Sequence, residues 1–439
     1  MALARLTGQV TRGPLASRAI ATARKPNVAS WTFVQFCAAF GLVTYADYFN
    51  LLGYSTAGIG GAGKYAFFLI LFAAFAHAWF RSRRIAFGWN APTIFLGFTL
   101  VSSIPFVAQM ISDGDTNSYA SAFVPSLIFA ISIAFDPRRF DADLAKLNRR
   151  LLQWLCLLCA LYVGELIVRS YSGLSYFALV ANQTNHLKSI VFVAALALAY
   201  LSDRSWVLIL FLLVLAGISE LLRPSSTLLI ALIVCGGLAF FIKMHRVGLA
   251  CWFLYGVLLV AAVAPFFLYF LPDVGSLITS FDEAAKSDAL GATSNANVRL
   301  VIMNVAFQRV EASSWLVGEM FSGGTTVQIS GLLPFWTGIY ASGLATIHSD
   351  YVCILLEGGL LGYLAFNLAF FLFGNHSLSV LTNSSGARRQ VVGTGLVTLC
   401  ALVIYCSTNP VLQAYQAAAI PFTILLCAQI ALRLNKQSD

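Results

Sequence analysis

The sequence predicts an all-α integral membrane protein with about twelve transmembrane helices and one large loop outside the bilayer. Apolar residues make up 59% of the 439 residues and charged residues only 10%, whereas a soluble domain carries roughly 25% charged residues. The apolar residues form continuous runs, and about 20 such residues cross a bilayer core of ~30 Å as a helix. The runs do not alternate between apolar and polar, which excludes a membrane β-barrel.

Twelve apolar runs are the predicted spans, and the link between the seventh and eighth, 222–225, is very short. The runs are 33–53, 65–80, 90–110, 119–135, 151–169, 188–202, 206–221, 226–242, 248–271, 347–373, 391–408 and 411–432. They divide the chain into four parts: a basic cytoplasmic tail (1–31), helices one to nine (32–271), a periplasmic loop with amphipathic helices (272–346), and helices ten to twelve with a short cytoplasmic C-terminus (347–439).

The distribution of basic residues predicts the orientation, because loops on the cytoplasmic side are rich in Lys and Arg. With the N-terminus inside, all but seven of the 27 lysines and arginines face the cytoplasm. The exceptions are Lys64, Arg169, Lys188, Arg223, Lys286, Arg299 and Arg309. The net charge of +9 is therefore a topology signal, and we expect no nucleic-acid partner. The basic, acid-free N-terminus also suits a mitochondrial transit peptide, an alternative that the residues leave open.

The nine cysteines all lie in apolar runs, so no disulfide framework is predicted. Cys156 and Cys159 form a CxxC pair inside a predicted span, and packing explains it better than redox or metal chemistry. No cluster of carboxylates and histidines has metal-ligand spacing. We therefore expect neither a metal nor a cofactor.

His348 is the predicted catalytic residue, because it lies where the long loop enters the tenth span and histidine is the commonest general base. A hydrogen-bonded interfacial cap is the alternative role. Asp350 and Tyr351 follow it as secondary candidates, and N-terminal capping of the helix explains Asp350 equally well.

Three cations at the predicted outer level are candidates for binding phosphate. Arg223 lies in the segment Ser219-Glu-Leu-Leu-Arg-Pro-Ser-Ser226. A charge at membrane depth costs free energy unless it has a partner, and Glu220 is one candidate partner. Lys188 lies in the polar approach to the sixth span, with His186 and Asn185 as secondary candidates, and snorkelling explains it as well.

Arg299 is the third cation and lies in the predicted amphipathic helix of the loop. Val298, Val301, Ile302 and Val305 recur at helical spacing, with a cap predicted at Ser294, Asn295 or Asn297. Arg299 lies beside this apolar stripe, so we expect it to point inward. Arg309, close to Glu311, is expected to be a solvated surface charge. Arginine forks match phosphate oxygens, so these cations beside a histidine base suggest group transfer from a lipid-linked diphosphate.

The order of these pieces resembles the bacterial O-antigen ligase and O-antigen polymerase superfamily of membrane glycosyltransferases, which have a GT-C-like fold. The resemblance lies in Arg223 before Pro-Ser-Ser, in Arg299 with Trp315-Leu-Val-Gly318, and in His348-Ser-Asp-Tyr-Val-Cys-Ile-Leu-Leu-Glu357-Gly-Gly-Leu-Leu-Gly362. The sequence departs from the family at Ser349, where Asn is usual, and at Leu222, where Ser is common before the arginine.

The resemblance implies a multi-pass protein of the bacterial inner membrane whose active site faces the periplasm. Arg223, Arg299 and Lys188 would hold the diphosphate of an undecaprenyl-diphosphate-linked glycan, and His348 would activate the acceptor hydroxyl for a metal-independent, inverting transfer. Glu357 is expected to be structural.

The acceptor distinguishes two functions within this superfamily. A polymerase transfers to another lipid-linked polysaccharide repeat, and a ligase transfers to lipid A-core. The Asp-Tyr pair after His348 favours O-antigen or exopolysaccharide polymerase, with ligase as the alternative. A flippase for lipid-linked oligosaccharides belongs to a different class, but transporters usually show inverted repeats that are not visible here. A third class, cell-wall glycosyltransferases, depends on an acidic loop residue, and Asp282, Glu283 and Asp288 lack a recognisable context for it.

Overall fold

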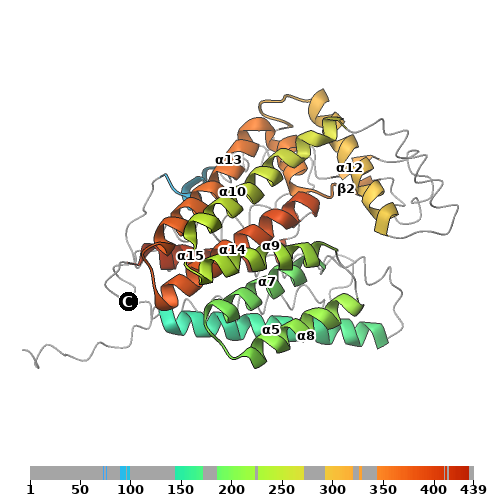
Figure 1. Cartoon of the computed structure of the whole chain (residues 1–439). Coiled ribbons are helices and arrows are strands. Elements are labelled where there is room, and N and C mark those ends of the chain that lie inside the picture. Colours follow the sequence, from blue (N-terminus) through green and yellow to red (C-terminus); the bar gives the residue numbers. More distant parts are fainter. Residues whose placement is uncertain are drawn as a thin grey trace, which may run out of the picture.

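The computed structural model is mostly helical, and the helices pack side by side as a bundle (Figure 1). The structure describes residues 73, 76, 89–94, 96–98, 144–171, 185–222, 226–270, 292–319, 326–328, 344–409, 411–412 and 415–434. The elements are α5 (Leu144–Tyr171), α7 (Asn185–Leu201), α8 (Trp206–Leu222), α9 (Ser226–Lys243), α10 (Val247–Val263), η2 (Ala264–Phe270), α12 (Ala292–Ala312), β1 (Thr326–Gln328), β2 (Leu344–Thr346), α13 (Asp350–Leu381), α14 (Gly386–Thr408) and α15 (Tyr415–Arg433).

The described helices are those of an all-α membrane protein. Four of them contain stretches long and apolar enough to cross a bilayer, Leu144–Val168, Val247–Phe267, Asp350–Leu381 and Gly386–Thr408, and shorter apolar helices accompany them. Eight predicted spans, from the fifth onward, coincide with α5, α7, α8, α9, α10 with η2, α13, α14 and α15. The first four spans lie mostly outside the described residues, so the number twelve stays a prediction.

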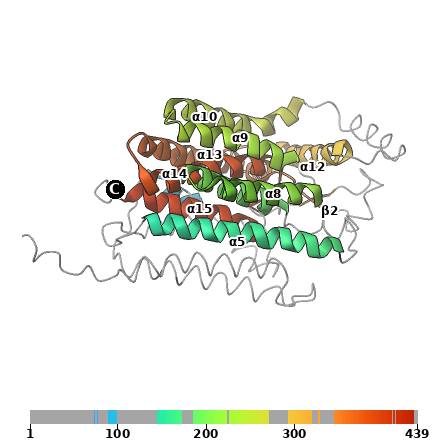
Figure 2. The ribbon, with the colours of Figure 1, turned by 60° about the horizontal axis from the view of Figure 1, so that its bottom comes forward.

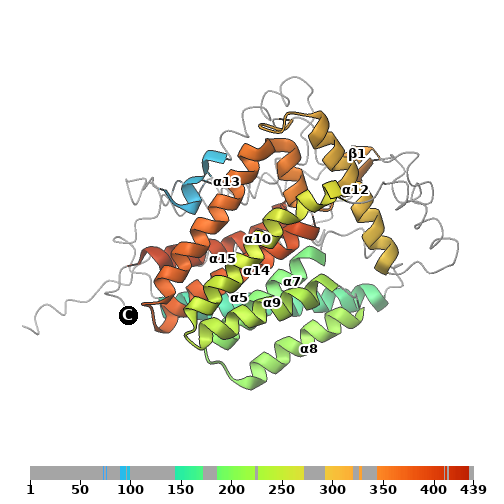
Figure 3. The same cartoon turned by 45° about the horizontal axis from the view of Figure 1, so that its top comes forward.

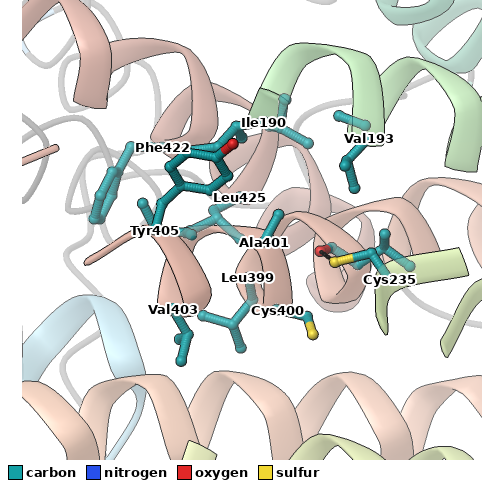
Figure 4. Close-up of a cluster of buried hydrophobic side chains, with 14 of the residues drawn as sticks. Ile190, Val193, Cys235, Leu399, Cys400, Ala401, Val403, Tyr405, Phe422 and Leu425 are labelled. Atoms are coloured by element: carbon teal, nitrogen blue, oxygen red, sulfur yellow. Dashed lines mark hydrogen bonds between the residues drawn. The ribbon is translucent and has the colours of Figure 1, made fainter. Parts of the chain in front are cut away.

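α14 is the centre of the bundle and packs against α15, α7, α13, α9, α10 and α5 (Figures 1 and 2). Small residues allow this close packing: a Cβ added to Gly395 would lie 2.3 Å from the Cβ of Ala428 on α15. Figure 4 shows the buried cluster in which Cys235 and Cys400 lie among apolar side chains. Cys235 donates to the carbonyl of Val397 at 3.7 Å. Van der Waals packing of this kind is the main force that joins helices in lipid.

The outer helices expose large apolar side chains to their surroundings. Trp206 at the start of α8 is 77% exposed, and Trp252 near the start of α10 is 80% exposed. Further exposed leucines and valines follow along both helices. A surface of this composition suits lipid, with tryptophan at the boundary between lipid and water.

One end of the bundle, here called the arginine end, is held together by basic side chains that bond to helix ends. Arg388 donates to the carbonyls of Ala431 and Leu432, both at 3.1 Å. Arg389 donates to Leu381 at 2.8 Å and to Ile242 at 2.6 Å. The last carbonyls of a helix have no partner within the helix, and a cation there is favourable.

Lys243 also lies at the arginine end, where it pairs with Asp203 and donates to the carbonyl of Tyr200 at 2.8 Å. The start of α14 differs from the sequence prediction, because the corresponding eleventh span, 391–408, was expected to begin at residue 391. α14 begins at Gly386, because Arg388 and Arg389 extend the helix and are buried. The opposite end, which contains His348, is here called the histidine end.

The long loop contains a helix and a pair of strands. α12 is the predicted amphipathic helix, and it buries Val301, Ile302 and Val310. The predicted cap at Ser294, Asn295 or Asn297 is wrong, because α12 already begins at Ala292 and these three residues lie inside it. β1 and β2 pair antiparallel, with Thr326 opposite Thr346. The sequence prediction of helices alone in this loop missed the strands, each only three residues long.

Candidate functional site

α13 is folded back on itself near its start, contrary to the predicted single span 347–373. Gly359 has φ 58° and ψ −162°, which breaks the helix into the segments 350–358 and 360–381. The ring of Tyr351 lies 5.8 Å from that of Tyr363 and 5.6 Å from that of Phe366. In a straight helix Tyr351 and Phe366 would be about 22 Å apart along the axis. The short segment therefore runs back alongside the long one, as the bend of α13 in Figure 3 also shows.

The fold-back carries the residues around His348 toward the end of α14. Ser349 is the N-cap of α13 and accepts a hydrogen bond from the backbone N–H of Val352, as helix-capping serines commonly do. Its hydroxyl also bonds to the carbonyl of Cys406 on α14 at 3.3 Å. Ser349, the residue that departs from the family pattern, therefore has a structural partner of its own.

Asp350 joins the same segment to the chain after α14. One oxygen of its carboxylate accepts backbone N–H bonds from Val411 at 2.7 Å and from Leu412 at 2.9 Å, and the residue is buried. Tyr351 is fully buried, and its ring packs between Tyr363 and Phe366. Asp350 and Tyr351, two of the secondary candidates, thus hold the folded-back segment in place.

Arg299 points from α12 into the histidine end, as predicted. Its guanidinium donates to the carbonyl of Thr408 at 3.3 Å and to the side-chain oxygen of Asn409 at 3.2 Å, at the C-terminus of α14. The partial negative charge of a helix C-terminus favours a cation at this position. The side chain stays partly exposed, so an anionic ligand has access to its charge.

His348 and Arg299 are close enough to interact electrostatically. Burial first, and the charge of Arg299 second, lower the pKa of His348 from 6.5 to about 4. His348 is therefore neutral near pH 7. Its Nδ1 is buried and has no hydrogen-bond partner among the described residues. A neutral imidazole within electrostatic reach of a guanidinium is able to accept a proton while the guanidinium holds an anion.

The remaining predicted cations are only partly described. Asn185, His186 and Lys188 form the first turn of α7, and nothing is described of their side chains. The other end of α7 lies at the arginine end, where Lys243 bonds to Tyr200, so this first turn lies toward the histidine end. Arg223 lies outside the described residues. The approach of Lys188 and Arg223 to His348 therefore stays a prediction.

The prediction that Arg309 is a solvated surface charge is wrong. Arg309 forms a two-pronged ion pair with Glu319 and donates to the carbonyl of Thr326 in β1 at 2.8 Å. The hydrogen bonds that Arg309 donates to Glu319, together with the charges of Glu319 and Glu357, raise the pKa of Arg309 above its ordinary value. Glu357 is fully buried in α13, and its expected structural role stays a prediction. The sequence signal missed here was Glu319, directly after the turn-forming Gly318.

The fold defines a helical membrane protein with a cation and a neutral histidine together at one end of the bundle. Among the described residues, no group of three His, Cys, Asp or Glu side chains is placed to hold a metal ion. Comparison of the chain with models of protein families and with curated proteins finds no match to either.

Proposed function

We propose that this protein is a membrane glycosyltransferase that moves a glycan from undecaprenyl diphosphate to an acceptor hydroxyl in surface polysaccharide assembly. The single observation that carries the proposal is the position of Arg299 and of a half-buried, neutral His348 at the same end of α14, within electrostatic reach of each other. A base and an anion-binding cation at the same end of the bundle match a reaction in which a hydroxyl loses a proton while a diphosphate leaves. The order of motifs along the chain supports the superfamily of O-antigen ligases and polymerases.

In the proposed reaction the acceptor oxygen attacks the anomeric carbon of the donor sugar. The bond from this carbon to the diphosphate oxygen breaks, and undecaprenyl diphosphate leaves with the electron pair. His348 takes the proton of the acceptor hydroxyl. Arg299, with Arg223 and Lys188 as further candidates, stabilises the charge that develops on the diphosphate. A single displacement inverts the configuration at the anomeric carbon.

The proposed setting is the bacterial inner membrane, with the histidine end facing the periplasm. The arginine end would then face the cytoplasm, as basic residues usually do. The lysine and arginine side chains that bond there, Lys243, Arg388 and Arg389, support this orientation. The acceptor we favour is a lipid-linked polysaccharide repeat, which makes the protein a polymerase.

The test is transfer by the purified protein in lipid, with a labelled undecaprenyl-diphosphate glycan and two acceptors in separate arms. His348→Ala and His348→Asn should lower the rate by roughly 10²–10⁴-fold, the usual contribution of a general base. His245→Asn is the matched control. It changes an exposed histidine at the arginine end, whose φ of 58° asparagine tolerates, and should leave transfer unchanged.

Each arm of the experiment decides one part of the proposal. Product with a lipid-linked repeat indicates a polymerase, and product with lipid A-core indicates a ligase. Full transfer by folded His348→Ala would remove His348 as the base. Movement of the labelled lipid across the membrane without any transfer would make the protein a flippase and end the proposal.

A further inference from the structure

The break in α13 is closed by a turn from the long loop, here called the latch (residues 314–319). A helix that reverses at one residue leaves the last carbonyls of the first segment and the first N–H groups of the second without partners. The latch supplies them. Glu319 donates its N–H to the carbonyl of Leu356 at 2.9 Å, and the carbonyls of Trp315 and Leu316 accept from Leu360 and Leu361 at 2.9 and 3.1 Å.

Two glycines make this contact possible because the two backbones touch. Gly318 has φ +62° and Gly359 has φ +58°, a conformation that costs other residues about 1–2 kcal/mol. A Cβ on Gly318 would lie 2.3 Å from the carbonyl oxygen of Leu356, and a Cβ on Gly359 would lie 2.5 Å from the nitrogen of Gly318. Only glycine fits at either position.

Arg309 fastens the latch to the rest of the site. It holds Glu319, the last residue of the latch, and it lies within the electrostatic reach of Glu357 in the short segment of α13. Its bond to Thr326 connects it to β1, whose partner β2 ends at Thr346, two residues before His348. Arg309 is therefore joined to His348 through the latch on one side and through the strand pair on the other.

The same helix, α12, carries Arg309 and Arg299. Ten residues separate them, a rise of about 15 Å. Arg299 contacts the end of α14 near His348, whereas Arg309 lies near Glu357, so α12 runs in the same direction as the short segment of α13. The edge-to-face pair of Phe307 and Trp315, with ring centroids 5.7 Å apart, joins α12 to the latch between these two points.

We propose that Arg309 and Glu319 are positioning residues of the transfer site, which lock the latch onto the break in α13 and so keep Arg299 and His348 together. This inference rests on the proposed function, to which it adds residues that contact neither donor nor acceptor. With the latch released, the break in α13 would lose three backbone hydrogen bonds, one at Leu356 in the short segment and two at Leu360 and Leu361 in the long one. α12 would lose its ion pair to the latch and keep its buried apolar side chains and the bonds of Arg299.

The test uses the full chain in lipid with Arg309→Gln and the nearly isosteric Glu319→Gln. Lys243→Gln is the matched control, because it breaks an ion pair at the arginine end. Amide exchange at Leu360 and Leu361 reports whether the latch is open. An NMR titration of His348 reports its surroundings without any need for transfer, and the transfer rate reports the reaction.

With the latch released, we expect faster exchange at both amides and an upward shift of the pKa of His348 by roughly one unit or more, toward its ordinary value. We also expect transfer to fall at least about tenfold, and Arg309→Lys, which keeps the charge but not the fork, to restore part of it. Lys243→Gln should change none of the three measurements.

The readouts separate this inference from the proposed function. Faster exchange with an unchanged pKa of His348 would show that the latch does not position the histidine. A shifted pKa with full transfer would show that the positioning does not serve the reaction. If the unaltered protein performs no transfer, the proposed function fails, while the exchange and titration data still decide whether Arg309 and Glu319 hold His348 in place.

Discussion

At the scale of single residues, His348 and Arg299 are the pair on which the proposed chemistry depends. Burial removes water from the imidazole, and a nearby guanidinium further disfavours a second positive charge. Both effects keep His348 in the form that accepts a proton. Arg299 donates hydrogen bonds to the end of α14, at the carbonyl of Thr408 and the side-chain oxygen of Asn409.

The lowered pKa of His348 predicts an unusual pH profile. Because the pKa is about 4, the neutral base predominates above that pH, and kcat/KM should stay flat from pH 8 down to about pH 5. Arg299→Gln removes a positive charge beside the imidazole, so the pKa rises and the loss of activity at acid pH should begin at a higher pH. Initial rates at low donor concentration measure both profiles. An acid limb centred near pH 6.5 in the unaltered protein would contradict the burial of His348.

At the scale of elements, the fold-back of α13 decides where His348 lies. The long segment 360–381 contains enough residues to rise about 33 Å and cross a bilayer core of ~30 Å alone. The short segment is therefore not needed for crossing and returns to pack Tyr351 on Phe366. The latch replaces hydrogen bonds that an uninterrupted helix would have made within itself.

The two latch glycines should be among the least replaceable residues of the chain. Gly359→Ala or Gly318→Ala combines a positive φ with a backbone clash, and we expect a loss of at least about 2 kcal/mol of stability. Gly217→Ala on α8 is the control, because a Cβ there meets nothing within 4 Å and alanine favours the helix by up to about 1 kcal/mol. Thermal unfolding in detergent compares the three. Equal midpoints for Gly359→Ala and Gly217→Ala would disprove the close contact.

At the scale of the whole molecule, the two ends of the bundle use arginine for different purposes. At the arginine end, Arg388 and Arg389 are buried and bond to helix carbonyls, which joins α14 to α9, α13 and α15. At the histidine end, Arg299 is partly exposed beside an imidazole. Buried arginines with several carbonyl partners stabilise the assembly, whereas the exposed one is available to a ligand.

Arg389 should therefore act on stability and not on chemistry. Arg389→Lys keeps the charge, but a single ammonium cannot reproduce the planar fork that reaches both Leu381 and Ile242. We expect a loss of roughly 1.5–3 kcal/mol, the value of a hydrogen bond to a charged group. Arg246→Lys, at an exposed position of the same end, is the control and should leave the unfolding midpoint unchanged. A midpoint for Arg389→Lys equal to that of the control would show that the bonds add nothing.

Much of the architecture was predictable because lipid restricts it. The predicted spans 206–221 and 226–242 match the bounds of α8 and α9 to within one residue. The agreement is close because a backbone in a bilayer must form its own hydrogen bonds within a helix. The inward direction of Arg299 followed from the apolar stripe of α12. The break at Gly359 was not predictable, because Glu357-Gly-Gly359 lies within a continuous apolar run. The partner of Arg309 was also missed, since Glu311 is nearer in sequence but Glu319 faces it in space.

The sequence by itself determined that this is a helical membrane protein, where most of its helices lie and which residues are worth testing. Composition and periodicity are local properties, and a bilayer accepts a segment according to its apolar length and its ability to form a helix. The tertiary structure alone decided that α13 turns back, that Asp350 and Tyr351 hold the returning segment, and that Arg309 with Glu319 secures the latch. Each of these depends on groups far apart in the chain. Leu356, Leu360 and Leu361 obtain their hydrogen-bond partners from residues about forty positions earlier, and no local pattern encodes such an exchange.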